Sequence, residues 1–223
     1  MTVAAASSTE LVARLRTVPR PLPVLARDRE RQLTDRQREI LDTLSELFDS
    51  GFADLTMAEI AGRANCSLRT LYTLAPSRDE LVLIVVDRML WRVGRSASGA
   101  IDPAMAALDA LTAYLQAATE VVDAMTAPFA RDLSLMPAAQ RLAAAHEEYT
   151  VAVATALLDL AVESGEISPV DTAAVARVMA SVALLLSRPE ISSTLSSAPK
   201  PAADSIVAIM VAGMRHGPPM SSA

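Results

Sequence analysis

The sequence predicts an all-α fold, with an N-terminal three-helix domain that contains a helix-turn-helix and a helical bundle that follows it. Apolar residues recur at helical spacing through most of the 223 residues. Capping residues, prolines and glycines separate these periodic stretches. The sequence lacks the alternating runs and the Asn-Gly or Asp-Gly turns that are typical of β-hairpins.

Residues 1–33 are expected to form a flexible arm rich in Arg and Pro. Three prolines between residues 19 and 23 prevent a continuous helix, and only a short turn near Leu11 and Leu15 shows any packing pattern. The segment lacks the apolar run of a secretion signal. Residues 11–38 contain eight arginines and three acidic residues. Two interpretations stay open: an arm that follows phosphates or the minor groove of DNA, and a solvated tail.

Residues 34–80 are expected to form the three-helix domain. The first helix has one apolar stripe, and its members are Ile40, Leu41, Leu44, Leu47 and Phe48. Gly51 is the expected left-handed stop after that helix. Thr56 and Glu59 have the spacing of a capping box, which predicts the start of a second helix.

The segment Asn65-Cys66-Ser67 is predicted to be a tight corner between two helices. Asn tolerates a positive φ better than other residues with a side chain, and Ser67 is a good N-cap for the third helix. Leu68 and Leu71 are expected to pack inward from that helix. Arg69 and its polar neighbours are then left facing outward. This layout is typical of a helix-turn-helix that reads DNA.

The stretch from Ile40 to Leu81 resembles the N-terminal domain of the tetracycline-repressor (TetR) family. It reads I-L-x-x-L-x-x-L-F-x-x-G-F-x-x-x-T-M-A-E-I-A-x-x-A-N-C-S-x-R-T-L-Y-x-x-x-P-S-R-D-E-L. The resemblance covers about a fifth of the chain. It implies a dimeric DNA-binding regulator that responds to a small molecule.

The sequence departs from the family pattern within this stretch. Asn65 and Arg69 each stand where the family usually has Gly, and Cys66 where it has a small β-branched residue. At residues 74 and 75, Leu and Ala replace an aromatic or His followed by Phe. Arg78 replaces a Lys that contacts phosphate in the family. These differences leave the fold prediction intact, but the operator sequence cannot be transferred.

The layout and the resemblance predict the residues that contact DNA. Those best placed to approach base edges or the nearby backbone are Ser67, Leu68, Arg69 and Thr70. Those expected to hold phosphates are Arg36, Arg38, Thr56, Tyr72 and Arg78. The whole chain carries a formal charge of −6, but its N-terminal part is basic, so the charge pattern supports an orientation of this domain toward DNA.

Residues 81–217 are expected to form the helical ligand-binding and dimerisation domain, with a C-terminal tail at residues 218–223. A first helix is predicted over Leu81–Arg92, followed by a breaker cluster at Gly94–Gly99, and Asp102-Pro103 is interpreted as the cap of the next helix. Further helices are predicted over Met105–Val122, Ala138–Val162, Val170–Leu186 and Ala202–Met214.

Two stripes in the last long helices are candidates for a homodimer interface. Their members are Val175, Val178, Met179, Val182, Leu186, Ile206, Ile209 and Met210. The resemblance implies dimerisation through the same helices, as a four-helix bundle between two chains. The alternative is that both stripes close the core of the single chain, because the two cases look alike in a sequence.

A pocket for a small-molecule effector is expected between the middle helices. With 3% aromatic residues and ten Met, its walls would be aliphatic and adaptable. The polar candidates for ligand contact are Tyr114, Arg131, His146 and Tyr149. For each of them singly, the alternative of a surface residue or a satisfied core residue is favoured over a ligand contact.

The sequence argues against an enzyme, a metal site and a membrane protein. Cys66 is the only cysteine, and the two histidines lie far apart at residues 146 and 216. No phosphate-binding glycine loop or nucleophile elbow is present, so no cofactor is expected. No uncharged apolar run reaches the ~18 residues of a membrane span. The single cysteine suits a reducing cytoplasm.

The sequence therefore predicts a cytoplasmic, homodimeric transcriptional regulator that binds double-stranded DNA. Its expected action is repression at a palindromic operator, relieved by a small apolar ligand. The alternative keeps the fold without the DNA function, as a helical small-molecule-binding or protein-interaction module. The missing ring at residue 75 and the acidity of the chain are the features that favour this alternative.

Overall fold

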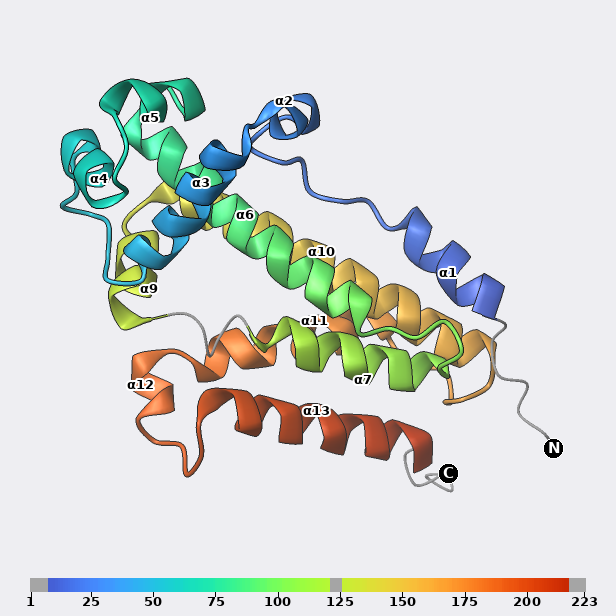
Figure 1. The fold of residues 1–223 in the computed structure, drawn as a ribbon. Helices are drawn as coiled ribbons and strands as arrows, with labels where there is room; N and C mark the ends of the chain where they lie inside the picture. Colours follow the sequence, from blue (N-terminus) through green and yellow to red (C-terminus); the bar gives the residue numbers. More distant parts are fainter. Residues whose placement is uncertain (1–7, 121–125, 217–223) are drawn as a thin grey trace. The chain divides into compact units, whose positions relative to one another are not determined.

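The computed structural model describes residues 8–120 and 126–216, and all regular secondary structure in these ranges is helical. The predicted all-α fold is confirmed. The chain divides into two compact units, each of which is discontinuous in sequence. We call residues 21–92 and 125–146 the HTH unit, and residues 1–20, 93–124 and 147–223 the bundle unit. The two long helices α6 (Arg78–Gly99) and α10 (Pro137–Glu163) contribute residues to both units (Figure 1).

The HTH unit is built on the three predicted helices, α3 (Asp35–Phe48), α4 (Met57–Arg63) and α5 (Leu68–Leu74). The short helices α2 (Arg27–Gln32) and α9 (Ala127–Ser134) complete it together with the parts of α6 and α10 that it includes. Its core is made by the apolar stripe of α3 and the inward residues of α4, α5 and α6. The fully buried members include Leu41, Leu44, Phe48, Ile60, Leu71 and Leu81.

Within the predicted N-terminal arm, the described residues before the prolines form a packed helix. Residues Ser8–Thr17 form helix α1 in the bundle unit, and Leu11 is 1% exposed there. Leu11 and Leu15 are spaced at i and i+4, so the helix places both on the same side, and Val18, the residue just after the helix, is also buried. The prolines stop α1 as expected, but they do not prevent the residues before them from packing.

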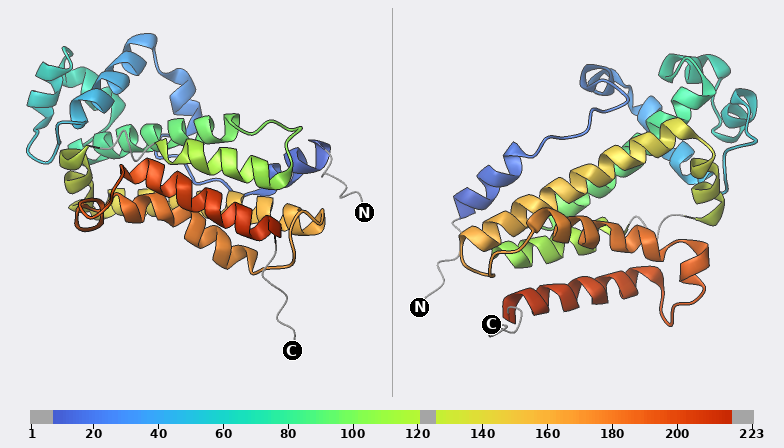
Figure 2. Two further views of the ribbon diagram at one scale, coloured as in Figure 1. Left: turned by 90° about the horizontal axis from the view of Figure 1, so that it is seen from below. Right: turned by 180° about the vertical axis from the view of Figure 1, so that it is seen from behind.

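The bundle unit contains α1, α7 (Ala107–Ala118), α11 (Thr172–Leu186), α12 (Pro189–Ser192) and α13 (Pro199–His216), with its parts of α6 and α10. Helix α13 packs along α11 and α7, and the views in Figures 1 and 2 show these helices side by side. The core of this unit is aliphatic, with Leu108, Leu111, Leu157 and Leu158 fully buried.

The predicted breaker cluster at residues 94–99 is wrong, because α6 continues to Gly99. Within this turn Ala97 is fully buried, and the hydroxyl of Ser98 donates to the carbonyl of Gly94 at 2.8 Å. Gly lowers helix stability by only about 1 kcal/mol relative to Ala, so burial of a neighbouring residue is enough to keep the helix going.

The predicted cap at Asp102-Pro103 is also wrong, because α7 begins at Ala107. Asp102 instead closes a turn by accepting the N–H of Ala104 at 2.9 Å. The first N–H groups of α7 have no acceptor within the helix and are bound by a residue far away in the sequence. The carboxylate of Glu166 accepts the N–H of Ala107 at 2.8 Å and that of Leu108 at 3.1 Å. A carboxylate at a helix N-terminus also interacts favourably with the helix dipole.

Candidate nucleic-acid interface

The corner between α4 and α5 has the geometry that the sequence predicts. Asn65 adopts a positive φ of 47°, and no other non-glycine residue in the described ranges does so. The N–H of Cys66 then reaches back to the carbonyl of Ala61 at 3.0 Å. Ser67 caps α5 by accepting the N–H of Thr70 at 3.0 Å. Partial burial raises the pKa of the Cys66 thiol, which fits a packing role.

Both helices that precede the corner begin with a capping box. Thr56 and Glu59 satisfy each other's backbone N–H groups at 2.8 and 3.3 Å, as predicted. These hydrogen bonds from Thr56 favour the charged carboxylate and lower the pKa of Glu59. Thr34 and Gln37 form a second box at the start of α3. Their T-x-x-Q spacing was the signal that could have located this helix start from the sequence.

Helix α5 buries one side and exposes the other. Leu71 is fully buried and Leu74 is 5% exposed, whereas Tyr72 is 55% exposed and Arg69 is exposed. Leu68 is 42% exposed, so the expectation that it packs inward is wrong. It occupies the first position of the helix, and the buried side begins three residues later, at Leu71. An outward Leu68 can contact a molecule that binds to the exposed side of α5, which an inward Leu68 could not.

The core beneath α5 is closed without the aromatic ring that the family has near residue 75. Ala75 is 1% exposed in the same core cluster as Leu74. Three rings from elsewhere belong to this cluster. The Phe48 and Phe52 rings are 5.4 Å apart, and Phe129 of α9 meets Phe52 edge-on at 5.8 Å. The core that supports α5 is therefore packed although residue 75 has no aromatic ring.

Arg78 binds the loop between α3 and α4 rather than extending into solvent. Its Nε donates to the carbonyl of Leu55 at 2.6 Å, and Nη2 donates to the carbonyls of Phe52 and, at 2.7 Å, Ala53. Nη1 pairs with Asp79 at 2.9 Å. The expected phosphate contact by Arg78 thus competes with a structural role that uses most of its donors.

We expect Arg78→Ala to lower the free energy of unfolding by about 2 kcal/mol, because three carbonyls lose a charged donor. Arg78→Lys should recover only part of this loss, since an ammonium group lacks the guanidinium fork. Urea denaturation measures both effects. The control is Arg63→Ala, an exposed arginine on α4. An unchanged denaturation midpoint in Arg78→Ala, together with weaker DNA binding, would return Arg78 to the phosphate-binding set.

Asp132 of α9 holds the same loop through its N–H groups. Its Oδ2 accepts the N–H of Phe52 at 2.6 Å and of Ala53 at 2.8 Å, and its Oδ1 accepts from Arg131 at 2.9 Å. Burial alone would raise the pKa of Asp132, but the two backbone N–H groups and Arg131 outweigh it and lower the pKa. This contact could not be predicted from the sequence, because 79 or more residues separate the partners.

Gly51 allows α9 to approach the loop. It has φ 95°, and a Cβ at this position would lie 3.0 Å from Oδ2 of Asp132 and 3.4 Å from Cβ of Pro128. Any side chain here would be strained by the backbone and crowded by α9. The glycine that was predicted as a helix stop therefore serves a second purpose, as the contact point for α9.

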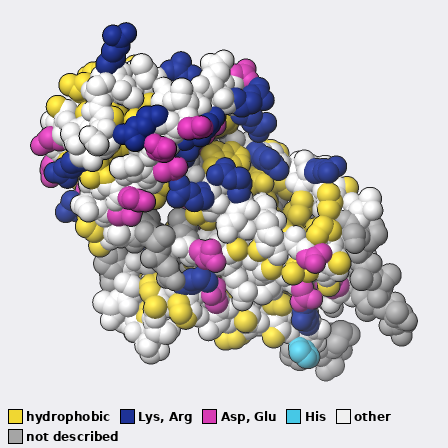
Figure 3. Space-filling model, in the orientation of Figure 1, with side chains coloured by type: hydrophobic (Ala, Val, Ile, Leu, Met, Phe, Trp, Pro, Cys, Tyr) yellow, Lys and Arg dark blue, Asp and Glu magenta, His cyan; other side chains and the backbone are white. Residues whose placement is uncertain are grey.

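The remaining basic side chains border α5 and α3. Arg36 donates to the carbonyl of Asn65 at 3.0 Å and pairs with Glu39 at 3.1 Å, and its side chain is 58% exposed. Arg38 pairs with Asp35 at 2.8 Å. Arg29 of α2 donates to the carbonyl of Thr73, near the end of α5. In the view of Figure 3, Lys and Arg side chains gather on the surface of the HTH unit.

The four predicted ligand contacts are divided between the two units. Tyr114 lies in the bundle core, 1% exposed, with its hydroxyl bonded to Thr150, and burial raises its pKa. Tyr149 belongs to the same unit and lines a cavity. Arg131 lies in the HTH unit, where it pairs with Asp132 and stays 65% exposed. Arg131 therefore pairs with the carboxylate that binds the α3–α4 loop.

His146 is a buried structural residue of the HTH unit. Its Nε2 lies 3.1 Å from Oδ1 of Asp87, and its ring meets that of Trp91 edge-on at 5.2 Å. The other oxygen of Asp87 accepts the N–H of Val24 at 2.9 Å, which fastens the segment before α2. These contacts match the alternative of a satisfied core residue, and a ligand contact by His146 stays a prediction.

The residues of the predicted dimer stripes differ in exposure: some are buried within the chain and others face solvent. Met179 and Val182 are 2% and 7% exposed, so they pack within the chain, as the alternative for these helices expected. Val178 and Ile209 are 54% and 71% exposed. The other four predicted residues, Val175, Leu186, Ile206 and Met210, are partly buried. Two further apolar residues on α11, Leu184 and Leu185, are exposed and were missed.

The described ranges contain no group of three or more His, Cys, Asp or Glu residues placed to hold a metal ion. In the same ranges, no helix combines the length and the apolar character that crossing a membrane requires. Cys66 is partly buried in its corner, and His216 contacts the carbonyl of Ala212.

Comparison with known proteins gives the fold an independent reference. No protein-family model and no curated protein matches the sequence. Among solved structures, a TetR transcription regulator from Haloarcula marismortui superposes with a TM-score of 0.67 at 17% identity, covering 82% of this chain and 99% of its own. A regulatory protein of the TetR family from Rhodococcus RHA1 (TM-score 0.61, 22% identity) covers 82% and 98%, and a TetR regulator from Streptomyces coelicolor (0.54, 23%) covers 80% and 98%. The chain therefore has the fold of the TetR transcriptional regulators.

Proposed function

We propose that this protein is a TetR-type regulator that binds double-stranded DNA as a homodimer and represses transcription. The observation that carries the proposal is the corner at Asn65–Ser67, which turns the chain so that α5 buries Leu71 and exposes Arg69 and Tyr72. A helix that is supported on one side and lined with polar and basic residues on the other is suited to the major groove.

The roles of the individual side chains follow from their exposure. The residues that would approach base edges are Ser67, the N-cap of α5, and Leu68, Arg69 and Thr70 in its first turn. Arg36, Arg38, Thr56 and Tyr72 would hold phosphates, and Arg78 would support the loop next to them. In a dimer, two such helices would enter successive major grooves about 34–36 Å apart, which requires a palindromic operator.

Genomic affinity selection tests this proposal. The purified protein is incubated with sheared genomic DNA from its source, and the bound fragments are sequenced. We expect enrichment of a palindromic site, including DNA that flanks its own coding region. Recovery of fragments in proportion to their abundance would contradict specific DNA binding and favour the small-molecule-binding or protein-interaction module.

The exposed apolar residues of α11 and α13 support the homodimer. Val178, Leu184 and Leu185 on α11 and Ile209 on α13 leave a set of large side chains in solvent in the single chain. A second copy that covers these helices would bury them.

We expect Ile209→Lys to raise the dimer dissociation constant about 30-fold, because a charge replaces a 71% exposed apolar residue at the proposed interface. Sedimentation velocity over a concentration series measures this change. The matched control is Leu135→Lys, since Leu135 is 69% exposed in the HTH unit. Equal dimerisation of the two variants would move the interface away from α13.

A small apolar effector is proposed to relieve repression by favouring a dimer geometry that misfits the operator. A coupling of ~1–3 kcal/mol between effector and DNA is typical of such linkage and changes operator occupancy several-fold or more. The aliphatic core of the bundle unit supports an apolar ligand. We propose the cytoplasm as the place of action, because that is where such a regulator meets DNA, and we propose no enzymatic activity.

A further inference from the structure

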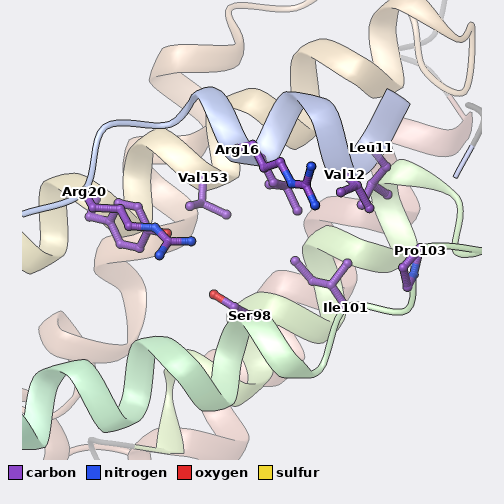
Figure 4. Close-up of a pocket in the computed structure, with 10 residues that line it drawn as sticks. Leu11, Val12, Arg16, Arg20, Ser98, Ile101, Pro103 and Val153 are labelled. Carbon is purple, nitrogen blue, oxygen red and sulfur yellow. The ribbon is translucent and has the colours of Figure 1, made fainter. Parts of the chain in front are cut away.

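A cavity of about 180 Å³ lies within the bundle unit beneath helix α1. Its roof is α1, and its other walls come from the end of α6, the α6–α7 loop and α10 (Figure 4). The apolar walls include Leu11, Leu15, Ile101 and Val153. Leu11 and Val153 are buried, so these walls are held by the core rather than by loose surface side chains.

Two arginines also line this cavity, and its lining contains no carboxylate. Arg16 on α1 and Arg20 just after it are directed into the space that Ser98 and Ile101 border (Figure 4). Neither guanidinium has an ion pair with any residue that the structure describes. The neighbouring arginine on α1 differs in this respect, because Arg14 is paired with Glu163.

The acidic groups near the cavity are already engaged. Glu163 binds Arg14, and the carboxylate of Asp102 accepts the N–H of Ala104 at 2.9 Å. Arg16 and Arg20 thus present two guanidinium groups at an apolar cavity, with no ion pair among the residues that the structure describes. A guanidinium presents a planar fork of N–H donors that matches a carboxylate or phosphate group.

We propose that this cavity binds an anionic amphiphile: a short apolar chain that ends in a carboxylate or phosphate group. The apolar chain lies against Leu11, Leu15, Ile101 and Val153, and the anionic group pairs with Arg16 and Arg20. The cavity volume of about 180 Å³ limits the length of the alkyl chain that a ligand can have. Drug-sized ligands occupy roughly 300–1,000 Å³, whereas a closed apolar cavity of about 150 Å³ accepts a ligand as small as benzene.

Isothermal titration calorimetry on the full chain tests this site in the absence of DNA, so its outcome is independent of the proposed DNA function. The probes share one alkyl chain and differ in head group: octanoate, octyl phosphate, 1-octanol and octylammonium. We expect saturable binding of at least one anionic probe, about tenfold tighter than 1-octanol, and weaker binding still of octylammonium. Octanoate and octyl phosphate together identify which anionic head group is preferred.

The variant Arg16→Gln/Arg20→Gln should remove the preference for the anion over 1-octanol, while binding of 1-octanol stays unchanged. Both arginines are exposed, so the fold is expected to tolerate the change. The matched control is Arg95→Gln/Arg188→Gln, which removes two exposed arginines of the same unit outside the cavity. A third variant, Ile101→Trp, should fill the cavity and weaken all probes.

Three results would overturn the proposal. These are the absence of saturable binding by either anion, equal affinity for anion and alcohol, and an equal loss of anion binding in the control variant. Circular dichroism melting curves verify that each variant is folded before titration. If only Ile101→Trp unfolds the protein, the arginine pair still decides the outcome.

Discussion

Asp132→Ala is expected to destabilise the protein by roughly 3 kcal/mol, since one buried and one partly buried N–H donor lose their acceptor and an unsatisfied buried donor costs about 1–3 kcal/mol. The donors are the N–H groups of Phe52 and Ala53, at 2.6 and 2.8 Å from Oδ2. The carboxylate itself is 1% exposed, so water cannot readily replace it. Arg131 would also lose its partner. Chemical denaturation followed by far-ultraviolet circular dichroism measures the change.

Asp132→Asn separates the hydrogen bonds from the charge. An amide oxygen can still accept both N–H groups, so we expect a loss of about 1 kcal/mol, from the charged contact with Arg131. Ser134→Ala is a suitable control in the same helix, because its hydroxyl bonds only to the carbonyl of Arg131, in its own helix. If Asp132→Ala were as stable as this control, Asp132 would not hold the α3–α4 loop.

The same residue predicts a pH dependence. The pKa of Asp132 is lower in the folded chain than the ordinary value of about 3.9 for an unfolded Asp, so the unfolded chain takes up the proton more readily. Its contribution to stability is therefore complete above that pH and is lost as the pH falls through the folded-state pKa. Below about pH 4 the wild type should lose stability more steeply than Asp132→Asn, as measured by denaturation at a series of pH values.

Arg69→Ala is expected to change which DNA sequence the protein prefers. Arg69 is exposed in the first turn of α5, and a bidentate contact from Arg to a guanine contributes about 1–3 kcal/mol of discrimination between bases. Affinity for the selected operator should therefore fall by roughly 10- to 100-fold, while affinity for random duplex changes much less. Fluorescence anisotropy with both duplexes at one fixed salt concentration measures this difference.

Arg188→Ala is the control for this experiment, because it removes an exposed arginine from the bundle unit. It should leave both affinities unchanged. An equal loss on operator and random duplex in Arg69→Ala would assign this side chain to phosphate binding instead. In that case the dependence of binding on salt should also become shallower, by about one unit in slope.

The parts of the fold that local chemistry determines were predictable from the sequence. The stripe of α3, the Thr56–Glu59 capping box and the positive φ at Asn65 each depend on residues within one or two turns of each other. Helix starts that depend on distant residues were not predictable. Helix α7 begins at Ala107 because Glu166 binds its first N–H groups, from 59 residues away.

The candidate site shows the same division. The exposed residues of α5 follow from its spacing and its cap, and they were identified correctly apart from the orientation of Leu68. The hydrogen bonds from Arg78 to the loop were not predicted, because a long side chain can reach either a phosphate or a carbonyl, and only the folded α3–α4 loop brings three carbonyls within its reach. The phosphate contact of Arg78 stays a prediction. The burial of α1 was also missed, because three apolar residues among prolines and arginines form too short a stripe to distinguish packing from solvation.

The central claim is that the exposed side of α5 faces the DNA. Its most direct test places a photo-crosslinking amino acid at Leu68, and a matched one at Leu135, which is 69% exposed in the same unit. Each protein is irradiated on the selected operator. We predict crosslinks from position 68 to bases of the major groove, and none from position 135. Absence of a crosslink from position 68, or equal crosslinking from both positions, would contradict the account.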